Sequence, residues 1–262
     1  MKNAVTITEP AAVAAMKEIY NLNGPGGLKW DFSSPGQVTA QDGRVTAIEG
    51  ALTGLNLDEA ELTGILKLHG IEALTVLDAG WNDLERIDFK NLPNLKELNL
   101  VCNNITDLKP LAGLTALTFL AACENKINDL GPLAGLTILT DLSVGENKIT
   151  DLGPLAGLTA LKCLELSYNK ITDLKPLAGL TALRFLPVCE NKITDLSPLA
   201  GLTALKCLDL SNNKITDFSP LAGLTALTYL RVDDNLAHPH AENSIIMNAL
   251  ARWPGFKANT EA

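Results

Sequence analysis

Residues 147–159 read Asn-Lys-Ile-Thr-Asp-Leu-Gly-Pro-Leu-Ala-Gly-Leu-Thr, and residues 191–203 repeat them with serine in place of the glycine at 153. The stretch belongs to a 22-residue unit, numbered here from its first leucine. Full units begin at Leu95, Leu117, Leu139, Leu161, Leu183 and Leu205, a 21-residue copy at Leu74, a degenerate copy at Leu52 and a truncated one at Leu227. Six consecutive copies in one phase indicate a repeat architecture in which each unit forms one coil of a solenoid.

The first half of each unit predicts a short strand. Positions 3 to 7 alternate, as in Cys163-Leu-Glu-Leu-Ser167, so positions 4 and 6 should point inward and positions 3, 5 and 7 outward. We expect these strands to stack as a parallel sheet. Position 9 is asparagine, and a buried amide there can satisfy main-chain groups where the chain turns, while stacked copies can bond to each other. We expect a structural asparagine ladder of Asn82, Asn103, Asn125, Asn147, Asn169, Asn191, Asn213 and Asn235.

The second half of each unit should return the chain through a short helical turn. The aspartate at position 13 can cap that turn, and the proline at position 16 presets its φ. Lysines three residues before most of these aspartates, and the lack of a multi-oxygen loop, argue against calcium sites. The glycine at position 19 permits a tight backbone step, whether right-handed or left-handed. The capping aspartates are Asp107, Asp129, Asp151, Asp173, Asp195 and Asp217.

The repeats divide the chain into three parts. Residues 52–235 form about eight to nine coils, residues 1–51 an N-terminal helical cap with a glycine-rich loop, and residues 236–262 a C-terminal helical cap. Apolar stripes at 10–23 and 246–253 predict the two cap helices. Because one repeat cannot bury its own leucines, the open ends of the stack need such caps.

Composition excludes several classes of function. The chain has 262 residues, 48 leucines and a formal charge of −9. A pI near 4.9 and the lack of a basic cluster exclude a nucleic-acid partner, and no apolar run reaches the ~18 residues of a membrane span. The absence of a signal sequence favours the cytoplasm, or secretion of a chain whose signal has been removed. Five dispersed cysteines favour free thiols, and only Cys102 and Cys123, on adjacent coils, could approach the distance of a disulfide.

The motif Asn-Lys-Ile-Thr-Asp-Leu-x-Pro-Leu-Ala-Gly-Leu-Thr resembles the leucine-rich repeat superfamily, and within it the 22-residue bacterial class typified by internalins. The resemblance covers about residues 52–235. It implies an α/β leucine-rich repeat solenoid: a curved, right-handed coil with a concave parallel sheet, and short 3-10 or loop segments on the convex side. It also implies that the concave sheet binds a protein partner.

Variation between copies points to a binding surface. Positions 10 to 22 are nearly copied from unit to unit, whereas positions 3, 5, 7 and 8 vary and carry aromatic and acidic residues. Exposed aromatics on a sheet are typical of protein-binding hot spots, although they could simply pack against each other across strands. We expect partner contacts from Trp81, Glu97, Phe119, Glu124, Asp141, Glu165, Tyr168, Phe185, Glu190, Asp209, Tyr229 and Arg231.

These observations favour a non-enzymatic, monomeric binding module with an acidic face rather than an enzyme. We find no nucleophile–base pair, no nucleotide-binding glycine loop and no cofactor motif. The cluster of His238, His240 and Glu242 is read as solvent-facing rather than as a metal site. The expected partner is a basic protein or peptide. The alternative is an engineered or consensus-like scaffold with a structural role and no natural ligand.

Overall fold

The computed structural model describes residues 38–41, 44–48, 54–59, 62–69 and 71–236, with the main chain alone for the first two ranges. The chain divides into two compact units, Met1–Lys126 and Ile127–Ala262, and each is described by itself. The two helices expected at 10–23 and 246–253, and the histidines at 238 and 240, lie outside the described residues. The part of the chain that is described contains no α-helix.

The first unit carries a parallel sheet built from position 3 to position 5 of successive coils. Its strands are β3 (Gly54–Asn56), β5 (Val76–Asp78), β7 (Glu97–Asn99) and β8 (Phe119–Ala121), paired in that order. Position 3 of one coil lies beside position 3 of the next, as Glu97 does beside Phe119. The predicted register is therefore confirmed within this unit.

A second sheet in the first unit differs from the prediction of loops and short helices. It consists of β1 (Val38–Gln41), β2 (Arg44–Ile48), β4 (Thr63–His69) and β6 (Asp83–Lys90), and β4 and β6 are parallel. The coils that contribute β4 and β6 lack the proline of position 16 and alternate apolar and polar residues instead, which suits a half-buried strand. β1 also falls in the segment expected to be a loop.

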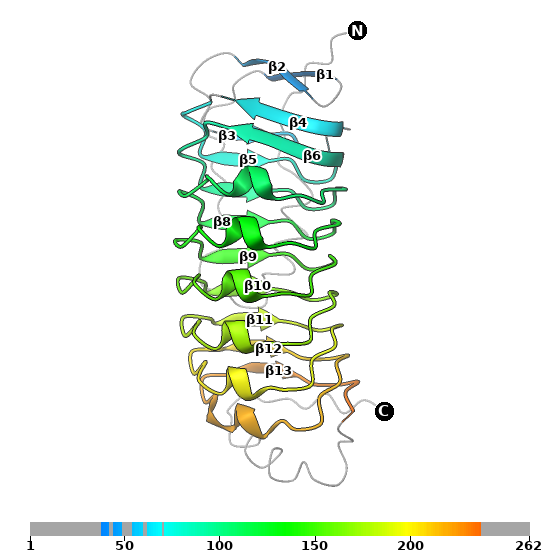
Figure 1. The fold of residues 1–262 in the computed structure, drawn as a ribbon, viewed down its shortest axis with the longest axis vertical. Helices are drawn as coiled ribbons and strands as arrows, with labels where there is room; N and C mark the ends of the chain where they lie inside the picture. The colour runs from blue at the N-terminus through cyan, green and yellow to red at the C-terminus, as the bar shows by residue number, and fades with distance from the viewer. Residues whose placement is uncertain (1–37, 42–43, 49–53, 60–61, 70, 237–262) are drawn as a thin grey trace. The chain divides into compact units, whose positions relative to one another are not determined.

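The second unit has the regular form of the repeat. Its parallel strands are β9 (Asp141–Ser143), β10 (Cys163–Glu165), β11 (Phe185–Pro187), β12 (Cys207–Asp209) and β13 (Tyr229–Arg231). Figure 1 shows its short helices in front of these strands, one to a coil. The 3-10 helices are η1 (Lys109–Leu111) in the first unit, and η2 (Gly131–Leu133), η3 (Gly153–Leu155), η4 (Lys175–Leu177), η5 (Ser197–Leu199) and η6 (Ser219–Gly223) in the second.

The position-13 aspartates bond to the first residue of each 3-10 helix, although the N-cap residue itself is the apolar residue of position 14. In each case a side-chain oxygen of the position-13 aspartate accepts a hydrogen bond from the main-chain N–H two residues later, at 2.7–2.8 Å. The glycines of position 19 do not use the left-handed conformation that glycine would permit. Gly64 is the one glycine with a positive φ among the described residues, and a Cβ on Gly157 would meet nothing within 4 Å. The tight step at position 19 is therefore made without a left-handed residue.

Each coil is filled by leucine and held to the next by asparagine. In the coil that starts at Leu161, the apolar residues of positions 1, 4, 6, 11, 14, 17 and 20 are 0–1% exposed. The amide of Asn169 accepts a bond from Ile149 N–H and donates to the carbonyls of Val144, Leu166 and Ser167. The ladder thus works through the main chain of two adjacent coils rather than through stacked side chains.

Candidate functional site

The variable positions 3, 5, 7 and 8 form one surface of each unit, called here the sheet face. In the second unit, position 3 runs in register through Asp141, Cys163, Phe185, Cys207 and Tyr229. Tyr229 is 38% exposed, Phe185 is half-buried and Cys207 is buried. Exposure along this column therefore rises at the last described strand.

Position 5 is more enclosed than the alternation predicted. Asp78, Asn99 and Ala121 are fully buried, whereas Glu165 and Asp209 are half-buried. The side chains turn back on their own strand: Glu165 accepts a bond from Ser167 N–H at 2.7 Å and Asp209 from Ser211 N–H at 3.0 Å. These two carboxylates, predicted as partner contacts, thus also close the turn after the strand.

Position 8 has a backbone conformation that sequence reasoning missed. Every described residue there has φ between 49° and 55°, in the left-handed region. This conformation costs an ordinary residue about 1–2 kcal/mol, and asparagine and aspartate tolerate it best. The asparagine and aspartate found at this position in two coils, Asn212 and Asp234, are the residues in the sequence that indicate a left-handed conformation there. The other residues are Glu59, Trp81, Cys102, Glu124, Glu146, Tyr168 and Glu190.

The bulky side chains at position 8 project into solvent. Trp81 in the first unit is 44% exposed and Tyr168 in the second is 53% exposed. Glu124 and Glu190 are exposed as well. The left-handed turn therefore presents one variable side chain per coil, at the edge of the sheet face.

Phe119 corrects the prediction of exposed aromatics. It is only 3% exposed and packs in a small apolar cluster with Val101 and Ala121, against which Cys102 and Cys123 also lie. Cross-strand packing, the alternative left open for the aromatics, is what this residue does. Phe119 therefore supports the sheet from within and offers no side chain to a partner.

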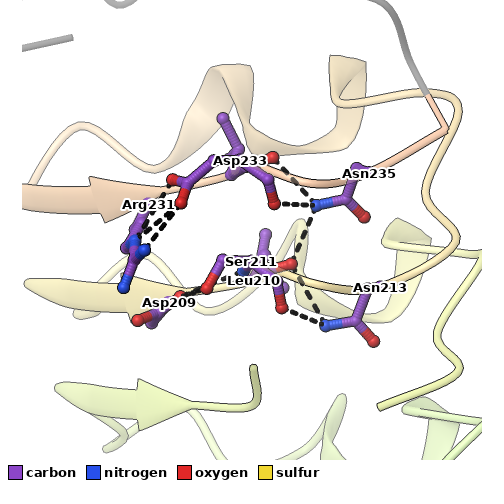
Figure 2. Close-up of polar contacts among 8 residues, drawn as sticks. Asp209, Leu210, Ser211, Asn213, Arg231, Asp233 and Asn235 are labelled. Carbon is purple, nitrogen blue, oxygen red and sulfur yellow. Dashed lines mark hydrogen bonds and ion pairs between the residues drawn. The ribbon is translucent and has the colours of Figure 1, made fainter. Parts of the chain in front are cut away.

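Arg231 is a cation on the sheet face of the second unit, and it is already paired. Its Nη2 lies 2.8 Å from Asp233 Oδ2 and its Nε 2.9 Å from the same oxygen, as Figure 2 shows. The hydrogen bond to Asp233 is the main cause that raises the pKa of Arg231. Asp209 lies opposite Arg231 on the preceding coil, and its negative charge also raises the pKa of Arg231. Because Arg231 is paired with Asp233, it neutralises the other carboxylates nearby only in part.

A family model described as leucine-rich repeats (2 copies) matches residues 93–135, 139–179, 159–201, 181–223 and 203–238. The matched residues contain the asparagine ladder from Asn103 to Asn235 and the 3-10 helices just described. The chain belongs to the leucine-rich repeat family. No curated protein matches the sequence significantly.

Solved structures of internalins share the fold of this leucine-rich repeat protein. Internalin C2 from Listeria monocytogenes is 34% identical, with a TM-score of 0.61, over 76% of this chain and 81% of that one. An internalin (inlF) from the same organism is 27% identical, with a TM-score of 0.64, over 92% and 79% of the two chains. The repeats are thus internalin-like. A plant peptide hormone receptor, RGFR1 in complex with RGF2, is 22% identical with a TM-score of 0.62 over 71% and 33%, and shows the fold alone.

The structure sorts the twelve predicted contact residues of this leucine-rich repeat protein by exposure. Within the described residues, one of the twelve, Phe119, is buried. The half-buried residues are Glu97, Asp141, Glu165, Phe185 and Asp209, and the exposed ones are Trp81, Glu124, Tyr168, Glu190, Tyr229 and Arg231.

None of the five cysteines of the sheet face forms a disulfide. Burial raises the pKa of Cys207 to about 11, and burial followed by the charge of Asp141 raises that of Cys163 further. Both thiols therefore stay protonated at neutral pH and are poor nucleophiles. Where the structure describes side chains, no three metal-ligating residues gather. No helix within the described ranges is long and apolar enough to cross a bilayer.

Proposed function

We propose that this leucine-rich repeat protein is a non-enzymatic binding module that takes a protein partner on its sheet face, the face that is concave in the fold the repeats resemble. The observation that carries the proposal is position 8. Trp81 and Tyr168 occupy a left-handed backbone position that asparagine or glycine would fill at lower cost, and both rings are exposed. Large exposed aromatics at such a site suit a binding role better than a folding role.

Charge supports a basic partner. The protein carries a formal charge of −9, and exposed carboxylates such as Glu124, Glu190 and Asp234 share position 8 with the two rings. Arg231 is held by Asp233. A basic protein or peptide would be steered toward this face, and its binding would weaken with added salt.

Affinity capture with two matched variants tests the proposal. The face variant combines Trp81→Asn, Tyr168→Asn and Tyr229→Ser, because asparagine tolerates the left-handed φ of position 8. The control is Ile138→Ser, which removes a side chain that is 48% exposed but belongs to position 22, away from the variable positions. We expect the partner to be retained by the wild type and by the control and lost from the face variant.

Equal retention by the face variant would rule out the sheet face as the binding surface. If retention does not change between low and high salt, the claim of electrostatic attraction fails, whereas the sheet face remains the proposed binding surface. If the wild type itself retains no protein, the alternative of a scaffold without a natural ligand is favoured. Unfolding in urea would verify that both variants stay folded.

A further inference from the structure

Three consecutive coils of the second unit place Glu146, Tyr168 and Glu190 side by side at position 8. Glu146 N–H donates to the carbonyl of Ser167 at 2.9 Å, Tyr168 N–H to that of Cys189 at 2.9 Å, and Glu190 N–H to that of Ser211 at 3.0 Å. These bonds fix the coils in register, about 4.8 Å apart. The tyrosine therefore stands between two carboxylate-bearing residues.

All three side chains reach solvent. Tyr168 is 53% exposed, and Glu146 and Glu190 are exposed. The charge of Cys189 is the largest cause that raises the pKa of the Tyr168 phenol, and the charges of Glu190 and Glu146 add to it. Both carboxylates thus act on the phenol electrostatically. Glu190 takes part in no ion pair within the described part of the chain.

We propose that Glu146, Tyr168 and Glu190 form a subsite for an arginine side chain of the partner, an inference that rests on the proposed function. A guanidinium is planar, so it can stack on the tyrosine ring while its N–H groups reach carboxylates on both sides. A ring alone would favour any apolar group, and carboxylates alone any cation. Their alternation along one column selects a flat cation.

Peptide binding tests the subsite directly. The probe is an acetylated peptide of four Arg-Gly repeats, titrated into the full chain by calorimetry at low salt. We expect Tyr168→Asn to weaken binding at least fivefold, Tyr168→Phe to stay within twofold because it keeps the ring, and Glu190→Gln to weaken binding about threefold. The charge-matched control is Glu85→Gln, an exposed residue of β6, which should stay within twofold.

Three results would overturn the subsite. One is an absence of binding by the wild type at millimolar peptide. The second is equal weakening by Glu190→Gln and Glu85→Gln, because attraction would then come from net charge. The third is no effect of Tyr168→Asn, because the ring would then take no part in binding. The subsite can fail while the proposed function stands. If the Trp81, Tyr168 and Tyr229 variant loses its partner while peptide binding is unchanged by Tyr168→Asn, the binding face stands and the arginine subsite does not.

Discussion

At the scale of single residues, two adjacent positions of the repeat have opposite roles, one stabilising the fold and the other varying at the surface. The asparagine of position 9 is buried, and its side-chain amide bonds to main-chain groups, as Asn169 does with four bonds. The residue of position 8, directly before it, is exposed and bears an unfavourable φ. Stability therefore resides in one residue of the pair and variability in the other.

Replacing Tyr168 by glycine should make the protein more stable. Glycine adopts φ = 55° freely, so the free energy of unfolding in urea should rise by up to about 1 kcal/mol even though the aromatic is lost. The matched control is Lys170→Gly, an exposed residue two positions later without positive φ, which should be destabilised. A loss of stability in the Tyr168 variant as large as in the control would mean that the ring packs against the protein.

Replacing Asn169 by alanine should be strongly destabilising. It leaves the buried N–H of Ile149 without a partner, and three buried carbonyls each lose one of their two donors. One unmet buried group costs about 1–3 kcal/mol, so we expect a loss of roughly 2 kcal/mol or more. The comparison is Asn235→Ala, which removes an equivalent but only half-buried amide and should cost less. Urea unfolding of both variants measures the difference, and equal losses would contradict it.

At the scale of the element, proline decides how a coil closes. Coils with Pro at position 16 form a 3-10 helix, as η2 to η6 do, whereas the coils of β4 and β6 lack that proline and form strands. Pro187 acts within a strand: one residue pair is in register between β10 and β11, compared with three between β11 and β12. A proline lacks the N–H that a ladder requires.

Two glycines of one coil should respond oppositely to alanine. A Cβ on Gly145 would collide with the carboxylate of Glu165 and disturb its bond to Ser167, so Gly145→Ala should cost about 1 kcal/mol. Gly157 has open space and no positive φ, so Gly157→Ala should gain about 0.5 kcal/mol by restricting the unfolded chain. Thermal unfolding of the two variants distinguishes them, and a shift of the same sign in both would refute this account.

At the scale of the whole molecule, negative charge is not confined to the surface. Asp78 in the first unit is fully buried, and one oxygen each of Asp58 and Asp78 has no hydrogen-bond partner. Burial is the main cause that raises the pKa of Asp58 to about 6 and that of Asp78 to about 7. The charge of Glu59 adds to the first shift and that of Asp58 to the second.

This buried pair should make stability fall as pH rises. An unfolded aspartate releases its proton near pH 3.9, whereas the folded pair retains protons up to pH 6 and 7, so the stabilisation present below pH 4 is lost as the pH rises through 7. Asp78 should account for roughly 2–4 kcal/mol of this decline. Urea unfolding at pH 4.5 and 7.5 measures it.

Asp78→Asn is the matched variant, because it keeps the oxygen that accepts from Gly80 and Asn99 but cannot ionise. It should remove most of the decline, and Glu85→Gln should leave it unchanged. Asp195 and Asp217, whose pKa values are lowered by the N–H groups they cap, stabilise in the opposite direction and lose that effect only under more acidic conditions. A wild-type protein equally stable at both pH values would disprove the assignment.

Much of the fold could be predicted from the sequence because each contact recurs at a fixed spacing. The inward leucines, the register of the strands and the capping by Asp107 and its equivalents all involve residues of one coil or its neighbour. The candidate site was harder to predict. Phe119 and Tyr229 share position 3 of the repeat, yet one is 3% and the other 38% exposed. Burial depends on the side chains of adjacent coils, which the pattern of one unit does not contain.

The repeat of 22 residues by itself determined the coils, the asparagine ladder and the helix caps, since these follow from local hydrogen bonds and apolar periodicity repeated in phase. The tertiary structure alone decided which variable side chains face solvent. Stacking buries Asn99 and Phe119, folds Glu165 back onto Ser167, and forces position 8 into a left-handed turn that carries Tyr168 outward. The physical reason is that exposure belongs to neighbouring coils together, whereas periodicity belongs to each coil alone.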